Sequence, residues 1–295
     1  MQGIWLPLIT PFANGSLDEI SLVRLLCRYL AMPIDGLILA ATTGEALTLE
    51  PEETERLVSI TAEAVAGRLP VFLGLSGSDT RRMVRRIHAT RPWPIDGYLI
   101  TCPYYTRPSQ EGLRQHFTVL AEQAGKPIAL YNIPYRTGVN MTNETLLRLA
   151  EHPNIIGVKD CCAVHAQTFD LLCARPAGFS VMTGEDPLFY AAIAHGADGG
   201  ILASAHIDPA GFAAMRNDLL AGNMARALER WRALARIVSL LFAEPSPAPI
   251  KHWLWREGWI ASPELRLPMT RVSDRLASRI EQSIECRQRR SVVTA

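Results

Sequence analysis

Eight short apolar segments alternate with helical patterns up to residue 204. They cover residues 4–9, 36–41, 70–75, 97–101, 128–133, 155–159, 180–183 and 200–204. Each segment is almost continuously apolar, which is typical of strands buried on both faces of a parallel sheet. Eight successive units of strand and helix predict an α/β fold, a (β/α)8 TIM barrel.

The segments between the apolar runs contain recognisable helix starts. We expect them at residues 16–19, 50–53, 109–112, 142–144 and 208–209, where capping residues, proline and acidic side chains gather. A doubly wound open sheet is the alternative fold. It usually has fewer strands and a glycine-rich turn after the first one, where this chain has Thr10-Pro11-Phe12.

The pattern changes after residue 222. Apolar residues recur at helical spacing over 224–241, prolines interrupt at 244–249, and further helices are expected at 251–259 and 271–285. We therefore predict a barrel over residues 1–222 and a C-terminal helical appendage, packed on that barrel, over residues 223–295. The basic run at 287–290 is expected to be a solvated tail.

Charge and cysteine content exclude several classes of protein. The chain has 30 Lys and Arg against 29 Asp and Glu, and these are interspersed, so neither a nucleic-acid groove nor a membrane-binding surface is expected. No apolar run has the length of a membrane span, and the N-terminus does not resemble a signal peptide. Six cysteines and seven histidines show no disulfide or metal-site spacing, so we expect a cytoplasmic protein with reduced thiols and no metal.

Lysine is scarce in this chain, and one lysine has an unusual setting. Only Lys126, Lys159 and Lys251 are lysines. Four apolar or small residues, 155–158, lead directly into Lys159, which predicts a buried strand that ends in an amine. Burial lowers the pKa of a lysine, and a neutral amine can form a Schiff base with a carbonyl compound. The alternative is a lysine that caps the strand through an ion pair.

Other strand ends carry polar groups that suit such a site, because catalytic groups of a barrel lie at the carboxyl ends of its strands. Residues 42–45, Thr-Thr-Gly-Glu, follow the second strand; they suit a small carboxylate or form a simple capping turn. Tyr131 and Arg136 follow the fifth strand. A tyrosine can relay a proton, and an arginine can bind a carboxylate through two hydrogen bonds.

Three further strand ends are less specific. The fourth strand leads to Tyr104 and Tyr105, of which at least one is expected to pack. Asp186 after the seventh strand, like Glu45, is expected to be structural. Gly199-Gly200-Ile201 in the eighth strand allow close approach of a ligand. Taken together, the polar groups on one barrel face favour carbonyl chemistry through a Schiff base.

Longer stretches resemble the dihydrodipicolinate synthase/N-acetylneuraminate lyase family of pyruvate-dependent class I aldolases. The matching segments are 42–45, 102–112, 131–138, 157–160, 242–251 and 265–270. Residues 136–138, Arg-Thr-Gly, favour the synthase branch over the sialic-acid lyase branch, which lacks that arginine. The resemblance implies a lyase of lysine and diaminopimelate biosynthesis. Its reaction condenses pyruvate with L-aspartate 4-semialdehyde to give 4-hydroxy-tetrahydrodipicolinate.

The resemblance also implies catalytic roles. Lys159 forms the Schiff base with pyruvate, and no separate cofactor is needed. Tyr131, Thr42 and Tyr105 form a proton relay, in which Tyr105 reaches into the site of a neighbouring subunit. This arrangement implies a homotetramer built from tight dimers.

Substrate-binding roles follow in the same way. Thr43 lies with Thr42 at the pyruvate carboxylate, and Arg136 binds the carboxylate of the aldehyde. Gly184 and Ile201 line the pocket through backbone groups. The substrates are small molecules, with no nucleic acid and no membrane as partner.

Several positions depart from the family pattern. Ala41 stands where glycine is usual, and Ser246 stands where asparagine is frequent. Cys161 and Cys162 replace small polar residues after the lysine. These positions lie on the aldehyde side of the site and in its loops.

A regulatory expectation also comes from the resemblance. Lysine-inhibited members of the family have an effector site with His, Asn and Glu, and the matching positions here are Pro51, Thr54, Ser78 and Arg82. Because Arg82 would repel the ammonium groups of lysine, we predict weak or no feedback inhibition.

Two other functions are compatible with the same pattern. A relative in the superfamily could cleave or make a 2-keto-3-deoxy sugar acid or N-acetylneuraminate, although Arg136 suits a short aldehyde with a carboxylate better than a polyol. A ligand-binding paralogue without catalysis would retain the barrel alone, and the complete set of polar groups argues against it.

Overall fold

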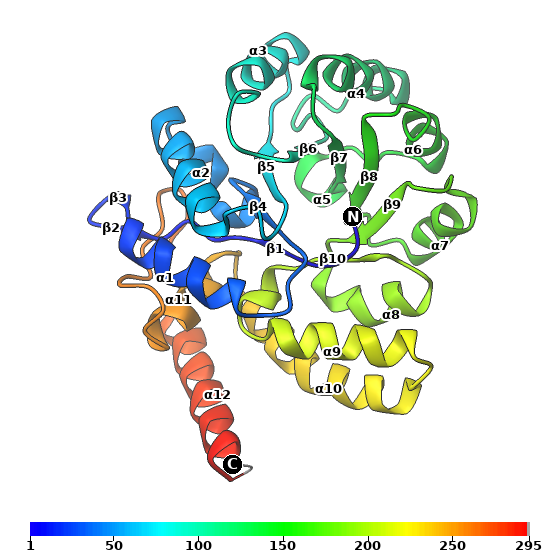
Figure 1. The fold of residues 1–295 in the computed structure, drawn as a ribbon. Helices are drawn as coiled ribbons and strands as arrows, with labels where there is room; N and C mark the ends of the chain where they lie inside the picture. The colour runs from blue at the N-terminus through cyan, green and yellow to red at the C-terminus, as the bar shows by residue number, and fades with distance from the viewer. Residues whose placement is uncertain (294–295) are drawn as a thin grey trace.

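The computed structural model describes residues 1–293, and it confirms the predicted eight-stranded barrel (Figure 1). All neighbouring strands are parallel, and β1 closes the barrel between β4 and β10. The strands are β1 Gly3–Pro7, β4 Gly36–Leu39, β5 Val71–Leu75, β6 Gly97–Thr101, β7 Ile128–Asn132, β8 Ile155–Asp160, β9 Ser180–Thr183 and β10 Gly199–Ile201.

Helices follow the barrel strands around the outside, and a small hairpin of β2 (Phe12–Ala13) and β3 (Ser16–Leu17) extends the first loop. The predicted helix starts are confirmed, and the side chains of Asp18, Ser109 and Asp208 each accept a backbone N–H of the first turn. The helices are α1 Glu19–Leu30, α2 Pro51–Val65, α3 Thr80–Thr90, α4 Gln110–Ala124, α5 Pro134–Thr137, α6 Asn143–Leu149, α7 His165–Ala174, α8 Phe189–Ala194 and α9 Pro209–Leu220.

The barrel is filled by side chains from alternate strand positions. This inner cluster comprises Trp5, Ile38, Ala41, Phe72, Leu99, Ala129, Tyr131, Ile133, Cys161, Met182 and Ile201. A larger apolar cluster lies between strands and helices. The inner cluster forms a solid floor, so the space for a ligand lies above it, at the strand ends.

The glycines of β10 pack closely against neighbouring parts of the protein. A Cβ on Gly199 would overlap with the backbone of Gly3 in β1, and a Cβ on Gly200 would crowd Leu202 and Phe189. Their small size therefore permits close packing inside the protein. The expectation that they allow close approach of a ligand stays a prediction.

Three C-terminal helices continue from the barrel: α10 Met224–Leu241, α11 Ala248–Arg256 and α12 Asp274–Val293. Helix α10 packs on α9, and Trp253 of α11 is fully buried in the same apolar cluster as the barrel helices. The basic run 287–290 belongs to α12, so it is not a tail. The division of the chain into a barrel over residues 1–222 and an appendage over residues 223–295 stays a prediction. Residues 294–295 lie outside the part of the chain that the structure describes.

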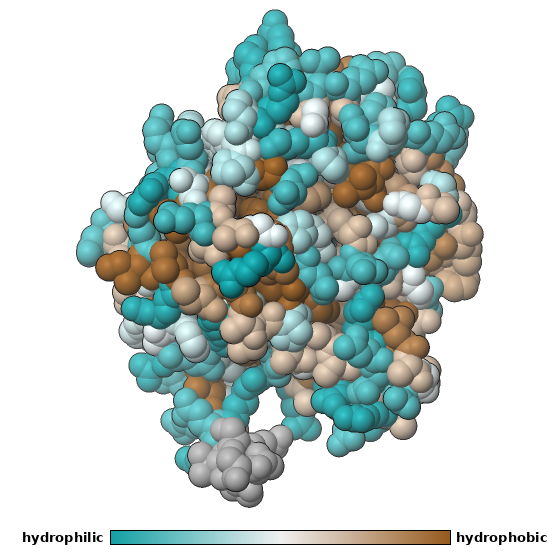
Figure 2. Space-filling view, viewed as in Figure 1, coloured by the Kyte–Doolittle hydropathy of each residue, from teal (hydrophilic) through white to brown (hydrophobic). Residues whose placement is uncertain are grey.

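The surface combines hydrophilic and apolar regions. On the face shown in Figure 2, hydrophilic residues cover most of the rim, and apolar residues gather nearer the middle. Among residues 1–293, no helix is both long and apolar enough to cross a membrane.

Candidate active site

Lys159 and Tyr131 form a buried pair at the carboxyl ends of two neighbouring strands. They occupy the same register position of β8 and β7. The ammonium nitrogen Nζ lies 4.4 Å from the centroid of the tyrosine ring. Lys159 is 5% exposed and Tyr131 is 4% exposed. The predicted buried strand that ends in an amine is therefore present, and no ion pair among the described residues involves that amine.

The surroundings of Lys159 favour the neutral amine. Burial is the main cause that lowers its pKa, and the guanidinium of Arg136 lowers it further. Cys161, Asp186 and Glu185 act in the opposite direction. A lowered pKa increases the share of the unprotonated amine, the form that attacks a ketone.

Tyr131 has the opposite shift. Burial raises the pKa of its hydroxyl well above the ordinary value, with smaller raising effects from Cys161 and Tyr135. The hydroxyl of Thr42 and the guanidinium of Arg136 counteract part of this rise. The phenol therefore stays protonated, and Thr42 is close enough to exchange a proton with it.

The turn that carries Thr42 and Thr43 follows β4 directly. Thr42–Gly44 forms a short 3-10 helix after the extended residue Ala41. Thr42 is exposed towards the strand ends, whereas Thr43 is buried. The structure thus brings Thr42 to Tyr131 and keeps Thr43 in the same turn.

Gly184 and Ile201 lie on the other side of the lysine. A Cβ on Gly184 would overlap with Cε of Lys159 and with Sγ of Cys161. Only glycine therefore leaves room for the lysine side chain at this position. Ile201 is fully buried, and its side chain belongs to the floor formed by the inner cluster.

Arg136 and Tyr105 are exposed at the same end of the barrel. Arg136 lies in α5, directly after β7, and no carboxylate of residues 1–293 forms an ion pair with its guanidinium. Tyr105 is 92% exposed, and its φ of 71° is rare for a bulky residue. Backbone strain of this kind is common at functional sites.

A pocket of about 330 Å³ opens above these strand ends. Its lining includes Thr42, Thr101, Tyr104, Arg136, Ser246 and Met269. Its walls come from the loops after β4, β5, β6 and β7 and from the C-terminal segment. The appendage therefore forms part of the site, and the size fits a small-molecule ligand.

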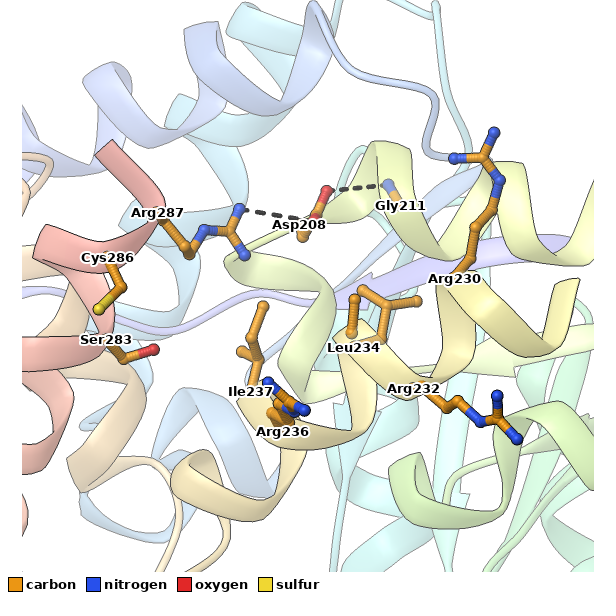
Figure 3. A pocket seen from close by; sticks show the side chains of 11 residues that line it. Asp208, Gly211, Arg230, Arg232, Leu234, Arg236, Ile237, Ser283, Cys286 and Arg287 are labelled. Carbon is orange, nitrogen blue, oxygen red and sulfur yellow. Dashed lines mark hydrogen bonds and ion pairs between the residues drawn. The ribbon is translucent and has the colours of Figure 1, made fainter. Parts of the chain in front are cut away.

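A second cavity, of about 560 Å³, lies between α9, α10 and α12 (Figure 3). Four arginines line it. Arg230 pairs with Asp218 at 2.6 Å and Arg287 with Asp208 at 3.5 Å. In Figure 3 the head groups of Arg230 and Arg232 point away from each other. Because its cations do not converge and it lies between helices, this cavity is not the candidate site.

Two residues that the sequence did not single out as chemical groups lie next to Lys159. Burial raises the pKa of the Cys161 thiol well above its ordinary value, which keeps the thiol neutral. Burial also raises the pKa of Glu185, and its contacts with Cys161 and Tyr135 oppose that rise. The position of both residues directly after a barrel strand is the only sequence signal for them.

The two carboxylates expected to be structural do make structural contacts. Asp186 accepts the N–H of Ser204 at 2.6 Å. Glu45 forms a buried ion pair with Lys251.

Comparison with known proteins places this chain in a family. Residues 1–286 match the model of the Dihydrodipicolinate synthetase family. A protein named 4-hydroxy-tetrahydrodipicolinate synthase 2 from Clostridium acetobutylicum is 42% identical over 96% of this chain and 99% of its own.

Solved structures of related proteins superpose on almost the whole of this chain. A monomeric dihydrodipicolinate synthase variant has a TM-score of 0.94 at 31% identity, over 97% of this chain and 96% of its own. A chloride-inhibited dihydrodipicolinate synthase from Acinetobacter baumannii, complexed with pyruvate, has a TM-score of 0.92 at 31% identity, over 96% and 98% of the two chains. The chain belongs to the dihydrodipicolinate synthetase family.

Proposed function

We propose that this protein condenses pyruvate with L-aspartate 4-semialdehyde through a Schiff base on Lys159, giving 4-hydroxy-tetrahydrodipicolinate. The observation that carries the proposal is the buried amine of Lys159 beside the hydroxyl-bearing ring of Tyr131. The name of the 42% identical relative and the pyruvate complex of the A. baumannii structure support it.

The first half-reaction would use Lys159 as the nucleophile. Its neutral amine attacks the ketone carbon of pyruvate, a C–N bond forms, and the ketone oxygen leaves as water. The resulting iminium withdraws electrons, so a methyl proton leaves and an enamine forms. Tyr131 and Thr42 would accept and return these protons, a task worth about 10²–10⁴ in rate. The contact between their hydroxyls supports this role. Thr43 would lie at the pyruvate carboxylate, with Gly184 and Ile201 along the pocket wall.

The second half-reaction would join the two substrates. The enamine carbon attacks the aldehyde carbon, a C–C bond forms, and the aldehyde oxygen takes a proton. The amine of the second substrate then attacks the iminium carbon and displaces Lys159. Arg136 lines the pocket, and its guanidinium forms no ion pair with a carboxylate of residues 1–293. Such a cation suits the carboxylate of the aldehyde. A polyol acceptor would leave that cation without a partner.

The exposed side chain of Tyr105 is the reason for proposing an oligomer. Its side chain is 92% exposed, whereas an active tyrosine needs a site around it. We propose that Tyr105 completes the relay of a neighbouring subunit in a tight dimer, and that two such dimers form a tetramer. The fold does not require this assembly, since one similar structure is of a monomeric variant.

The acceptor distinguishes this function from its relative in the superfamily. Purified protein with pyruvate is offered aspartate semialdehyde in one assay and aldose acceptors or N-acetylmannosamine in another. We expect product only with aspartate semialdehyde. Preferential turnover of the sugars would contradict the proposed function.

A further inference from the structure

A buried ion pair connects α11 to the turn that carries Thr42. The ammonium of Lys251 contacts the carboxylate of Glu45, and the two side chains are 0% and 2% exposed. Lys251 Nζ also donates a hydrogen bond to the carbonyl of Glu264 at 2.9 Å and lies 4.3 Å from the centroid of the Phe12 ring. Water is excluded from this pair, so loss of one partner would leave an uncompensated buried charge.

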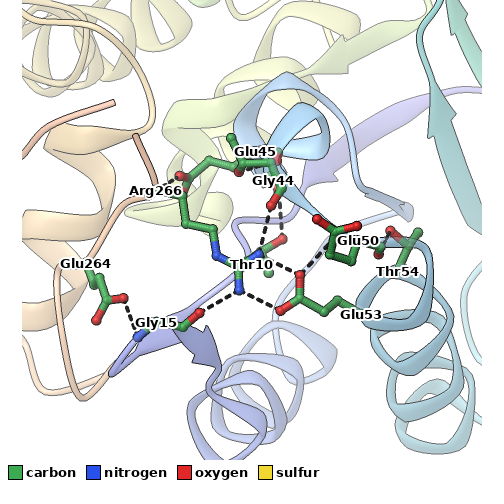
Figure 4. Close-up of polar contacts among 10 residues, drawn as sticks. Thr10, Gly15, Gly44, Glu45, Glu50, Glu53, Thr54, Glu264 and Arg266 are labelled. Atoms are coloured by element: carbon green, nitrogen blue, oxygen red, sulfur yellow. Dashed lines mark hydrogen bonds and ion pairs between the residues drawn. The ribbon is translucent and has the colours of Figure 1, made fainter. Parts of the chain in front are cut away.

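Arg266 strengthens the same connection (Figure 4). Its backbone N–H donates to Oε2 of Glu45 at 3.1 Å, and its guanidinium donates to the carbonyl of Thr48 at 2.8 Å. The guanidinium also contacts both carboxylate oxygens of Glu53 at 2.5 Å. The C-terminal segment therefore holds this turn through side-chain and backbone contacts at once.

The backbone of Glu45 has an unfavourable conformation that these contacts help to maintain. Its φ is 55°, in the left-handed region that residues other than glycine rarely adopt. Glu45 joins two 3-10 helices, Thr42–Gly44 and Ala46–Thr48, and its N–H donates to the carbonyl of Thr42 at 3.1 Å. Such a conformation persists only when its surroundings fix it. The contacts of the Glu45 side chain therefore contribute to holding the Thr42 turn, together with the hydrogen bond that Thr10 Oγ1 donates to the carbonyl of Gly44 at 2.7 Å.

We propose that the Lys251–Glu45 pair is a positioning device for catalysis, which holds Thr42 where its hydroxyl meets Tyr131. Lys251 and Glu45 act through this turn and not on the reacting atoms. The inference rests on the proposed function, because the orientation of Thr42 matters only if Tyr131 moves protons at the Schiff base.

The experiment compares two double variants. One removes the charges of the Lys251–Glu45 pair, and the control removes the charges of another ion pair, far from the Thr42 turn. K251M/E45Q removes both charges, keeps a long stem beside Phe12 and keeps an acceptor for the N–H of Arg266. The control, R175M/D198N, removes the partly buried Arg175–Asp198 pair, which lies at the opposite end of the barrel, where Asp198 precedes β10. Neutral replacement of a buried pair often preserves stability. Thermal unfolding checks both variants. If K251M/E45Q does not fold, K251Q/E45Q serves instead, because it also removes both charges and its new amide at position 251 can donate to the carbonyl of Glu264.

Two readouts separate positioning from stability. Borohydride trapping counts the sites that bind pyruvate on Lys159, and NMR follows exchange of the pyruvate methyl protons with deuterium. Because a positioned proton relay contributes about 10²–10⁴ in rate, we expect folded K251M/E45Q to trap pyruvate but to exchange the protons at least about tenfold more slowly than the unmodified protein. The control should exchange them at the unmodified rate.

Two results would overturn the inference: unmodified exchange in folded K251M/E45Q, or equal slowing in R175M/D198N. If the unmodified protein neither traps pyruvate nor exchanges the methyl protons of pyruvate, the proposed function itself is wrong. The positioning role would then be wrong as well.

Discussion

Lys159 and Tyr131 lie side by side on β8 and β7, with the lysine Nζ 4.4 Å from the centre of the tyrosine ring. Burial shifts the two groups in opposite directions: it lowers the pKa of the amine and raises that of the phenol. The same desolvation thus favours a neutral nucleophile and a protonated tyrosine, two groups that Schiff-base chemistry uses together.

Substitution of Tyr131 by phenylalanine removes the hydroxyl that we propose transfers protons, and it keeps the ring. We expect turnover to fall by about 10²–10⁴ with folding unaffected. Tyr98→Phe is the matched control, because Tyr98 is also a buried barrel tyrosine but faces the helices and lies 3.1 Å from the hydroxyl of Thr90. It should cost about 1 kcal/mol of stability and leave turnover intact. Steady-state rates and thermal unfolding of both variants decide this prediction, and an active Tyr131→Phe would refute it.

Gly184→Ala should prevent the lysine from adopting its observed position. The new Cβ would overlap with Lys159 Cε and Cys161 Sγ, and misplacement of a reacting group by about 1 Å can cost about 10²-fold in rate. Gly112→Ala in α4 is the control, because its Cβ would meet Pro108 at an ordinary 3.4 Å. Pyruvate trapping on Lys159 is the measurement. Equal trapping by the two variants would show that the space at Gly184 is not required.

The pH dependence of Schiff-base formation should follow the lowered pKa of Lys159. The free amine reacts, so the rate should rise with pH and level off below the ordinary lysine value of 10.5. Arg136 contributes to the lowering, so Arg136→Gln should raise the pKa and move this rise to higher pH. Trapping rates with pyruvate alone, across the pH range, test the sign without interference from the aldehyde. A shift to lower pH would contradict the assignment.

Feedback inhibition by lysine should be weak or absent. Of the positions matched to the effector site, Arg82 lies in the first turn of α3 and is exposed, and its cation would repel the ammonium groups of the effector. Initial rates at increasing lysine concentration test this prediction. A clear inhibition curve at sub-millimolar lysine would overturn it.

The barrel strands and the buried lysine at the end of one of them were predictable from local sequence, because each depends on neighbours in the chain. An apolar run that ends in Lys159 predicts a buried strand with an amine at its end, and such a strand is present. The Lys251–Glu45 pair was not predictable, because its members meet only after α11 packs against the turn following β4. Gly199 illustrates the same limit: a glycine has the same pattern whether a ligand or a neighbouring strand lies against it.

The most direct measurement is borohydride reduction of the protein in the presence of pyruvate, followed by peptide mapping. Lys126 donates to the carbonyls of Trp93 and Ile95 at 2.8 and 2.7 Å, and Lys251 is fully buried against Glu45, so neither amine is free to react. We expect one added reduced pyruvate, on the peptide that contains Lys159. The absence of an adduct, or an adduct on Lys126 or Lys251, would contradict this expectation.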